Sequence, residues 1–189
     1  MLLMSIKMLT EAGYEYIGMD HFALPSDELA LAREKGTLRR NFQGYAAKAG
    51  SEVFAFGITG ISQLENVYSQ NAKSTEEYYK SLENEKFPVF KGISLSFDDR
   101  VRREVISSIM CNDFIDKNKI AGLYGIDFNE YFSGEMKLLD DFRMDGMLFD
   151  DSDYIKITGR GKIILRNIAM TFDSYIKEDT KKNLYSKTV

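Results

Sequence analysis

The chain has 189 residues, of which 44% are hydrophobic and 13% aromatic, so it can bury a core and is not disordered. Its net charge of −4 offers no general basic field for nucleic acid, and its single cysteine, Cys111, excludes a disulfide framework and an all-cysteine metal site within one chain. No segment looks like a signal peptide or a run of about 20 apolar residues, which predicts a cytoplasmic chain without a membrane span.

The first 72 residues follow the order helix, strand, loop, helix, strand. After a first helix, YEYIGM at 14–19 predicts a strand and DHFALP at 20–25 a loop. Ser26 is expected to cap the second helix, and EVFAFGITGIS at 52–62 has the composition of a buried strand. This order is typical of α/β layered or barrel folds, but about two such strands are too few to close a sheet. We therefore expect residues 1–72 to be the last elements of an incomplete α/β barrel.

Residues 73–189 are predicted to form a mostly helical domain. Asp98 is expected to cap a helix, and FNEYFSGEMKLLDDFRMDG at 128–146 has one apolar face with helical spacing. MLFDDSDYIKIT predicts a β-hairpin near 147–157, and Thr158 is expected to start a final helix. Helices, a hairpin and a helix form a winged-helix-like order, so the predicted class for the whole chain is α+β, mostly helical.

The segment GTLRRNFQGY concentrates groups that bind anionic, ring-bearing ligands. Arg40 supplies a guanidinium, Gln43 an amide, and Phe42 and Tyr45 supply rings. A carboxylate-bearing aromatic or a nucleoside would suit this set. The alternative is a solvated turn with Phe42 in the core, and the residues alone leave both interpretations open.

His21 is the only histidine of the chain and directly follows a predicted strand. Ligands gather at strand ends in α/β folds, which favours a functional role. No partner is visible in the sequence, however, so we favour the interpretation that His21 hydrogen-bonds a neighbour and shapes its loop.

The segment GITGIS has glycines three positions apart, Gly57 and Gly60, and lacks the GxGxxG fingerprint of dinucleotide sites. These glycines would permit close backbone approach to a ligand, with Ile58 and Ile61 as apolar walls. Core packing explains the same pattern equally well.

No metal site is predicted. Cys111 lies in an apolar helix, where cysteine is usually a small hydrophobe. Asp150, Asp151 and Asp153 lack the spacing of a calcium loop and are expected to form a solvated turn.

The winged-helix-like order raises nucleic acid as a partner. The helix in the recognition position is acidic, with Glu130, Glu135, Asp140 and Asp141, so we expect no nucleic-acid binding. A stand-alone winged-helix-like module that binds a protein or nucleic acid is nevertheless kept as the alternative function.

Five segments together resemble one enzyme family. They are YIGMDHFALPSDELA, RNFQGY, RREVISSIMCN, YFSGEMKLL…DGML and ITGRGKIILRNIAMTFD. In this order they are similar to the oxygen-independent coproporphyrinogen III oxidases, radical S-adenosylmethionine enzymes of haem biosynthesis. The resemblance runs over nearly the whole chain but covers only the C-terminal part of the family. The CxxxCxxC motif that binds the iron–sulfur cluster in the family is absent.

The resemblance implies a role in converting coproporphyrinogen III to protoporphyrinogen IX by radical oxidative decarboxylation of two propionates. The family uses S-adenosylmethionine and a four-iron four-sulfur cluster, and one cysteine cannot replace three thiolate ligands. We therefore expect a C-terminal fragment whose residues 1–72 belong to the radical barrel. It is expected to bind neither cofactor stably, to be inactive alone, and to depend on the missing N-terminal barrel and the porphyrinogen substrate. An incomplete barrel is also expected to associate with itself.

The resemblance also assigns site residues. Phe42, Gln43 and Ile61 fall where the family contacts a second S-adenosylmethionine. His21 would border the substrate, and we add Arg40 as a partner for a propionate. None of these is expected to be catalytic. After RNFQGY the family usually has hydroxyl residues, where this chain has Ala46 and Ala47.

Overall fold

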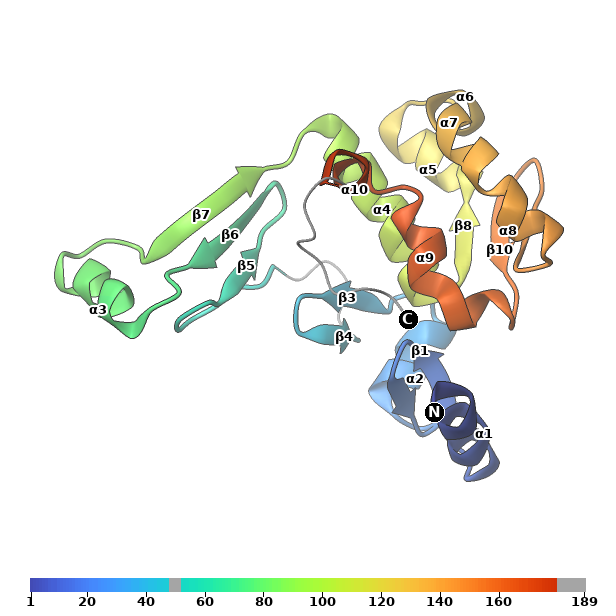
Figure 1. Ribbon diagram of the computed structural model, residues 1–189, viewed down its shortest axis with the longest axis horizontal. Coiled ribbons are helices and arrows are strands. Elements are labelled where there is room, and N and C mark those ends of the chain that lie inside the picture. Colours follow the sequence, from blue (N-terminus) through green and yellow to red (C-terminus); the bar gives the residue numbers. More distant parts are fainter. Residues whose placement is uncertain (48–51, 180–189) are drawn as a thin grey trace.

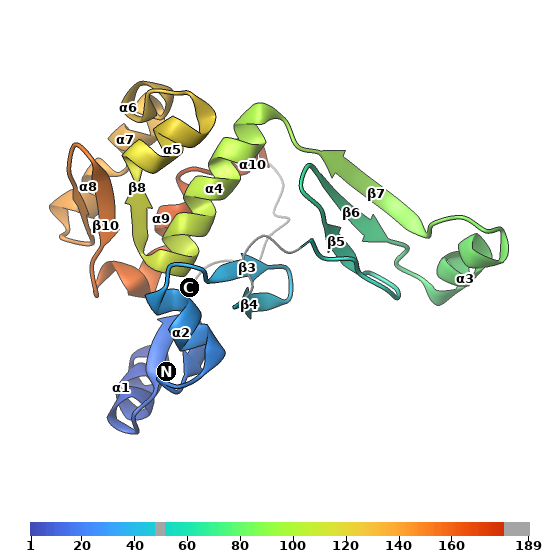
Figure 2. The same ribbon diagram turned by 180° about the vertical axis from the view of Figure 1, so that it is seen from behind.

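The computed structural model describes residues 1–47 and 52–179 and has three parts (Figure 1). An N-terminal layer, residues 2–46, packs against a helical domain, residues 97–179. Between them in the sequence, residues 52–94 form an arm that extends away from both parts, as Figure 2 shows from behind. The mixed α+β class agrees with the prediction.

The N-terminal layer consists of two short helices and two antiparallel hairpins. Its elements are α1 (Leu2–Glu11), β1 (Glu15–Gly18), β2 (His21–Ala23), α2 (Glu28–Glu34), β3 (Arg39–Asn41) and β4 (Gly44–Ala46). β1 pairs with β2 and β3 pairs with β4. Ile17 and Leu38 are buried in a small core that also takes in Cys111 from the helical domain. The layer is thus anchored on its neighbour.

Two local predictions in this layer were wrong. His21 lies in a strand rather than a loop, because a tight turn at Met19, with a φ of 53°, folds the chain back onto β1. The second helix is capped by Asp27, whose carboxylate accepts a hydrogen bond from the Leu29 N–H at 2.9 Å, rather than by Ser26. Strand pairing therefore fixes the backbone that carries the histidine.

The arm is a three-stranded antiparallel sheet with one helix. Its elements are β5 (Ile61–Gln63), β6 (Val67–Asn71), α3 (Thr75–Glu83) and β7 (Val89–Ser94), with strand order β5-β6-β7. All residues of β7 are exposed. This strand therefore contributes hydrogen bonds to the sheet but no buried core.

The prediction of a buried strand over 52–62 was wrong. Within it, Val53 makes a single bridge to Gln63, and regular strand structure begins only at Ile61. The side chain of Phe56 is 89% exposed. The composition suggested burial, but composition alone does not reveal whether a second element covers the segment.

The strands of residues 1–72 form short antiparallel pairs with one another. Every strand pair in the described part of the chain is antiparallel, whereas an α/β barrel is built from parallel pairs. A boundary after residue 72 runs through the arm, because Asn71 of β6 pairs with Val89 of β7.

The helical domain contains the main core. Its elements are α4 (Phe97–Asn112), β8 (Phe114–Asp116), α5 (Lys117–Tyr124), α6 (Phe128–Tyr131), α7 (Ser133–Leu138), α8 (Asp140–Met144), β9 (Leu148–Asp150), β10 (Tyr154–Ile157), a 3-10 helix (Gly161–Ile164), α9 (Leu165–Met170) and α10 (Ser174–Asp179). Its sheet has the order β8-β10-β9, and β9 and β10 form a hairpin at the predicted place. No helix in the described residues has the length and hydropathy needed to cross a bilayer.

The long helix α4 begins two residues earlier than a cap at Asp98 would place it. Ser96 and Asp99 form a reciprocal capping box, which satisfies two backbone N–H groups at once. The Asp98 carboxylate instead accepts hydrogen bonds from Arg102 at 2.7 Å and from the Tyr131 hydroxyl at 2.6 Å. The acid thus ties α4 to α6 rather than capping its own helix.

Residues 128–146 form three short helices rather than one. The backbone leaves helical geometry at Phe132, with φ −101° and ψ 23°, and α7 ends at Leu139. Both side chains are buried. Because residues seven apart lie on one face of a straight helix, burial of both side chains does not require these bends, and the apolar pattern alone does not mark them.

Candidate functional site

The predicted binding segment RNFQGY is the β3–β4 hairpin. Arg40 pairs with Tyr45 and Asn41 with Gly44, which leaves Phe42 and Gln43 as a two-residue turn. The Asn41 side chain accepts a hydrogen bond from the Gln43 N–H at 2.8 Å, as asparagine commonly does in tight turns. Phe42 is 58% exposed, so it does not lie in the core.

The tip of this hairpin contacts the arm. The Phe42 ring packs edge-on against Tyr68 of β6, with centroids 5.5 Å apart and an interplanar angle of 89°. β6 pairs with β5, where Ile61 lies opposite Gln70. Phe42 and Ile61 are thus linked only through β6, which contacts Phe42 at Tyr68 and pairs with β5. Tyr68 was missed, because nothing in its polar strand marks a ring that supports a distant turn.

His21 has the partner that the sequence did not reveal. Its Nδ1 lies 2.8 Å from a carboxylate oxygen of Asp20, which can only accept, so Nδ1 carries the proton. The ring packs edge-on against Tyr45 at 5.0 Å. A Cβ at Gly44 would come within 3.2 Å of Nε2, so the glycine allows the two hairpins to approach. Nε2 therefore faces the backbone of the β3–β4 hairpin at Gly44.

Tyr45 joins Arg40, His21 and the helical domain. The Arg40 guanidinium lies over the Tyr45 ring, 5.7 Å from the ring centroid. The Tyr45 hydroxyl donates a hydrogen bond to the Met110 carbonyl at 2.9 Å. Burial raises the pKa of Tyr45 to about 12, with a smaller contribution from the Cys111 thiol. The phenol therefore stays protonated as a neutral anchor, while the exposed Arg40 carries the positive charge.

Cys111 does not have the properties of a metal ligand. Only 1% of it is exposed, and burial raises the pKa of its thiol to about 11. A cluster needs several thiolates, and within residues 1–47 and 52–179 no group of three acidic, histidine or cysteine side chains converges. The residues of this chain do not fit an iron–sulfur cluster.

A buried ionic cluster fastens the N-terminal layer to the helical domain. The Asp113 carboxylate accepts a hydrogen bond from Arg33 of α2 and forms an ion pair with Lys162, whose Nζ lies 2.6 Å from it. Arg33 also donates to the Tyr16 carbonyl of β1 at 2.6 Å. Sequence reasoning missed this cluster, because its members are spread across three distant segments.

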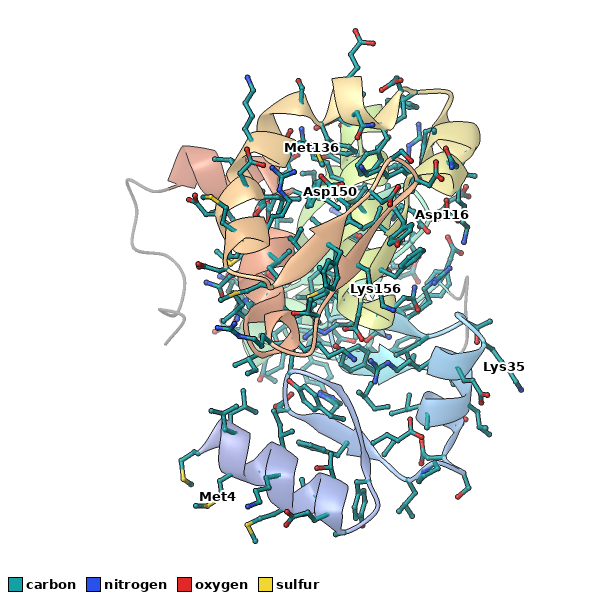
Figure 3. The ribbon with its side chains drawn as sticks, turned by 90° about the vertical axis from the view of Figure 1, so that its right-hand side faces the viewer. Met4, Lys35, Asp116, Met136, Asp150 and Lys156 are labelled. Atoms are coloured by element: carbon teal, nitrogen blue, oxygen red, sulfur yellow. The ribbon has the colours of Figure 1, made fainter. Side chains whose placement is uncertain are left out.

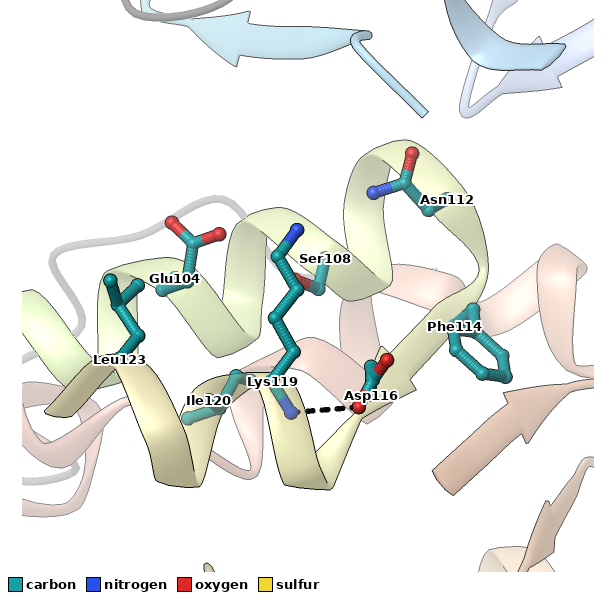
Figure 4. A pocket seen from close by; sticks show the side chains of 8 residues that line it. All are labelled: Glu104, Ser108, Asn112, Phe114, Asp116, Lys119, Ile120 and Leu123. Carbon is teal, nitrogen blue, oxygen red and sulfur yellow. Dashed lines mark hydrogen bonds between the residues drawn. The ribbon is translucent and has the colours of Figure 1, made fainter. Parts of the chain in front are cut away.

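Two surface hollows on the helical domain are candidates for ligand binding. Figure 4 shows the smaller one, about 60 Å³ between α4 and α5, where the Lys119 N–H donates to Asp116 at 2.8 Å. Pockets for organic ligands usually measure about 300–1,000 Å³, so this hollow holds at most a few water molecules. The larger hollow, about 510 Å³, lies on the domain's sheet.

Comparison with known proteins identifies the relatives of this chain. Residues 95–164 match the HemN C-terminal domain. The oxygen-independent coproporphyrinogen III oxidases of Synechocystis sp. and Escherichia coli K12 are 43% and 37% identical to it. Each alignment covers 98% of this chain, and 41% and 40% of the two relatives.

A solved structure agrees with these matches. Coproporphyrinogen III oxidase (HemN) from Escherichia coli, described as a radical SAM enzyme, superposes with a TM-score of 0.89 at 40% identity. The match covers 92% of this chain and 40% of that one. These findings confirm the resemblance predicted from the motifs. The chain is homologous to the C-terminal part, about 40%, of oxygen-independent coproporphyrinogen III oxidase, and it contains the HemN C-terminal domain.

Proposed function

We propose that this chain acts as the C-terminal region of an oxygen-independent coproporphyrinogen III oxidase, which converts coproporphyrinogen III to protoporphyrinogen IX. The observation that carries the proposal is the continuous match of 98% of the chain to two-fifths of such an enzyme. In this role residues 1–72 complete a radical barrel, and residues 73–189 form a winged-helix-like domain beside it. The parallel strands of that barrel would come from the N-terminal part of the enzyme.

The chain's contribution to the active site would be the surface around the β3–β4 hairpin. Phe42 offers a ring, Gln43 an amide and Ile61 an aliphatic wall, a set that suits the adenosine and amino-acid parts of a second S-adenosylmethionine. Arg40 would pair with a propionate of the substrate. His21 would border the substrate, held in orientation by Asp20.

The fold also supports a need for the N-terminal barrel. When bound, a reduced iron–sulfur cluster supplies the electron for radical formation, and its ligands would have to come from outside this chain. Apolar side chains on α1 and in the arm, such as Met4 and Phe56, are largely exposed. A barrel packed there would cover them. Without it, the chain is expected to be inactive and to associate with itself.

The test compares the chain alone with a fusion to the N-terminal region of the Synechocystis relative. We expect the fusion, reconstituted without oxygen, to convert coproporphyrinogen III, and the chain alone to show neither conversion nor cluster absorbance. Activity of the chain alone would contradict the proposal, as would an inactive fusion that folds and carries its cluster.

The site assignment is tested in the same fusion. Phe42→Ala and Gln43→Ala are each expected to lower kcat/KM about tenfold, which corresponds to the loss of roughly 1.4 kcal/mol of binding in the transition state. Met144→Ala is the control, because this methionine is exposed on α8 and lies outside both the hairpin and the arm. An unchanged kcat/KM in both site variants would remove the hairpin from the site.

A further inference from the structure

The outer face of the β8-β10-β9 sheet presents aromatic rings around a lysine. Lys156 of β10 lies between Phe114 of β8 and Phe149 of β9 in the strand register. Figure 3 faces this sheet and labels Lys156 on it. Ile155 and Leu148, on the opposite face, are buried in the core. The two faces are therefore segregated as the pleat requires, with rings directed outward.

The outward rings differ in exposure, since Phe114 is partly buried whereas Phe149 is exposed. Phe149 is 64% exposed. Phe114 stacks on Tyr154, with centroids 5.4 Å apart and planes inclined by 25°. Aromatic rings on a sheet surface with no covering element are costly in water, which favours a ligand with an apolar surface.

The groove of about 510 Å³ runs from these rings to the turn after β10. Its lining comprises Asn112, Asp113, Phe114, Phe149, Lys156, Ile157, Thr158, Gly159 and Lys162. The volume falls within the range of small-molecule sites. It is therefore large enough for a ligand with a flat ring system.

The charges of the groove favour an anion. Its one carboxylate, Asp113, is already paired with Arg33 and Lys162. Lys156 makes no ion pair with any residue that the structure describes, and its side chain is exposed. The ammonium of Lys156 is thus the group that a ligand anion would meet first.

One wall of the groove also carries an unsatisfied acceptor. The Asn112 side-chain oxygen is buried without a hydrogen-bond partner among the described residues. Buried polar atoms are seldom left unpaired, so this oxygen would suit a bound water behind the groove wall rather than the ligand itself.

We propose that this groove binds a planar aromatic ring that carries a carboxylate or phosphate. The ring would lie against Phe149 and Phe114, and the anionic group would pair with Lys156. The groove shares no residue with β2 or with the β3–β4 hairpin. The inference uses only the helical domain, so it does not depend on the proposed oxidase activity.

The test measures binding of two probes to the whole chain without any cofactor. Coproporphyrin III, a flat tetracarboxylate, is followed by its own absorbance, and adenosine monophosphate is followed by calorimetry. Saturable binding of either probe that Lys156→Glu weakens and Arg40→Ala leaves unchanged supports the proposal, and the probe that binds identifies the anion as a carboxylate or a phosphate. No saturable binding of either one up to about 1 mM, the weak end of specific affinities, would overturn it.

Variants locate the bound probe. We expect Lys156→Glu to weaken binding at least tenfold and Phe149→Ala about fivefold, as loss of a charge-assisted contact and of ring contact would give. The matched controls Lys137→Glu and Phe87→Ala alter exposed residues outside the groove and should change the dissociation constant less than about twofold. Because the altered side chains are exposed, the fold should persist, which urea unfolding checks. Binding that both groove variants leave unchanged would contradict the proposal.

Discussion

The helical domain and the arm are built from similar proportions of apolar residues but use them differently. In the helical domain, Val105, Ile109 and Phe172 are fully buried in one core. In the arm, Phe87 and Phe56 are 90% and 89% exposed, and no residue of β7 is buried. The first region has the packing of an independent domain, and the second has the surface of a component that needs a partner.

The two regions therefore differ in how they gain stability from their apolar side chains. A domain that buries its own apolar surface gains its stability locally, and changes within it should unfold it. A sheet that exposes the same kinds of side chain gains little from them while it is alone. The same kind of substitution should therefore cost far more stability in the helical domain than in the arm.

A pair of Phe→Ala substitutions measures the contrast directly. Phe132 is fully buried. Its ring centroid lies 4.9 Å from that of Phe128 and 5.2 Å from that of Phe172. Phe132→Ala should lower the free energy of unfolding by about 3–5 kcal/mol. Phe87→Ala should change it by less than about 0.5 kcal/mol. Urea unfolding compares the two, and equal losses would show that the regions do not differ.

The ionic cluster at Asp113 is predicted to control the contact between the N-terminal layer and the helical domain. Asp113→Asn keeps a residue that tolerates the φ of 54° at this position but leaves Arg33 and Lys162 without their acid. Loss of a buried ionic partner should cost about 3 kcal/mol. Hydrogen exchange should quicken in α2 and β1 more than in α4.

Asp145→Asn serves as the control for that experiment, because Asp145 is exposed at the end of α8. It should leave hydrogen exchange in α2 unchanged. If Asp113→Asn also leaves it unchanged, the contact between the two parts does not depend on this cluster.

Alkaline pH should loosen the same contact more gently. Burial raises the pKa of the Cys111 thiol from 9.0 to about 11 and that of Tyr45 from 10.0 to about 12. Folding thus favours the neutral forms of both groups. Their contribution is complete below pH 9.0 and is lost as the pH rises through about 11 and then about 12.

The expected loss is about 2 kcal/mol or less in the free energy of unfolding near pH 10–11. Urea unfolding at neutral and alkaline pH measures it. Cys111→Ala should remove the earlier part of the decline while lowering stability somewhat at every pH through lost packing. A decline of the same size in Cys111→Ala would assign the effect to other groups.

Self-association is the smallest expected effect. The exposed face of α1 includes Leu3, Met4 and Met8, and burying it against a second copy would be favourable. Light scattering should show an apparent mass that grows with concentration, and Leu3→Glu with Met4→Glu should reduce that growth. A monomer at every concentration would show that this surface does not drive association.

The sequence predicted those parts of the fold that local signals determine. The hairpin near 147–157 was found because apolar strands flank an acidic turn, and α4 because its apolar stripe is regular. The cap at Ser96 and the bends at Phe132 and Leu139 were missed, because each depends on which neighbouring side chains are buried. Composition likewise could not show that Phe56 lacks a cover.

The candidate site likewise contains some residues that the local sequence predicted and others that it could not predict. RNFQGY was recognised as a binding segment because its charged, amide and aromatic groups lie together in the sequence. The ring of Tyr68 and the acid of Asp113 could not be predicted, because they reach the hairpins only through tertiary contacts. Asp20 could have been found, since it directly precedes His21.

The hydrogen bond between Tyr45 and Met110 affects the order in which parts of the chain can fold during synthesis. The hydroxyl and its carbonyl are 65 residues apart, and Arg33 and Asp113 are 80 apart. At about 5–20 residues per second, the ribosome would release the hairpins roughly 3–16 s before their support exists. Two-stranded hairpins alone are barely stable in water, so they would remain unfolded during this interval. The region that bears the candidate site would therefore be made before the helical domain but would acquire its shape only after that domain has been made.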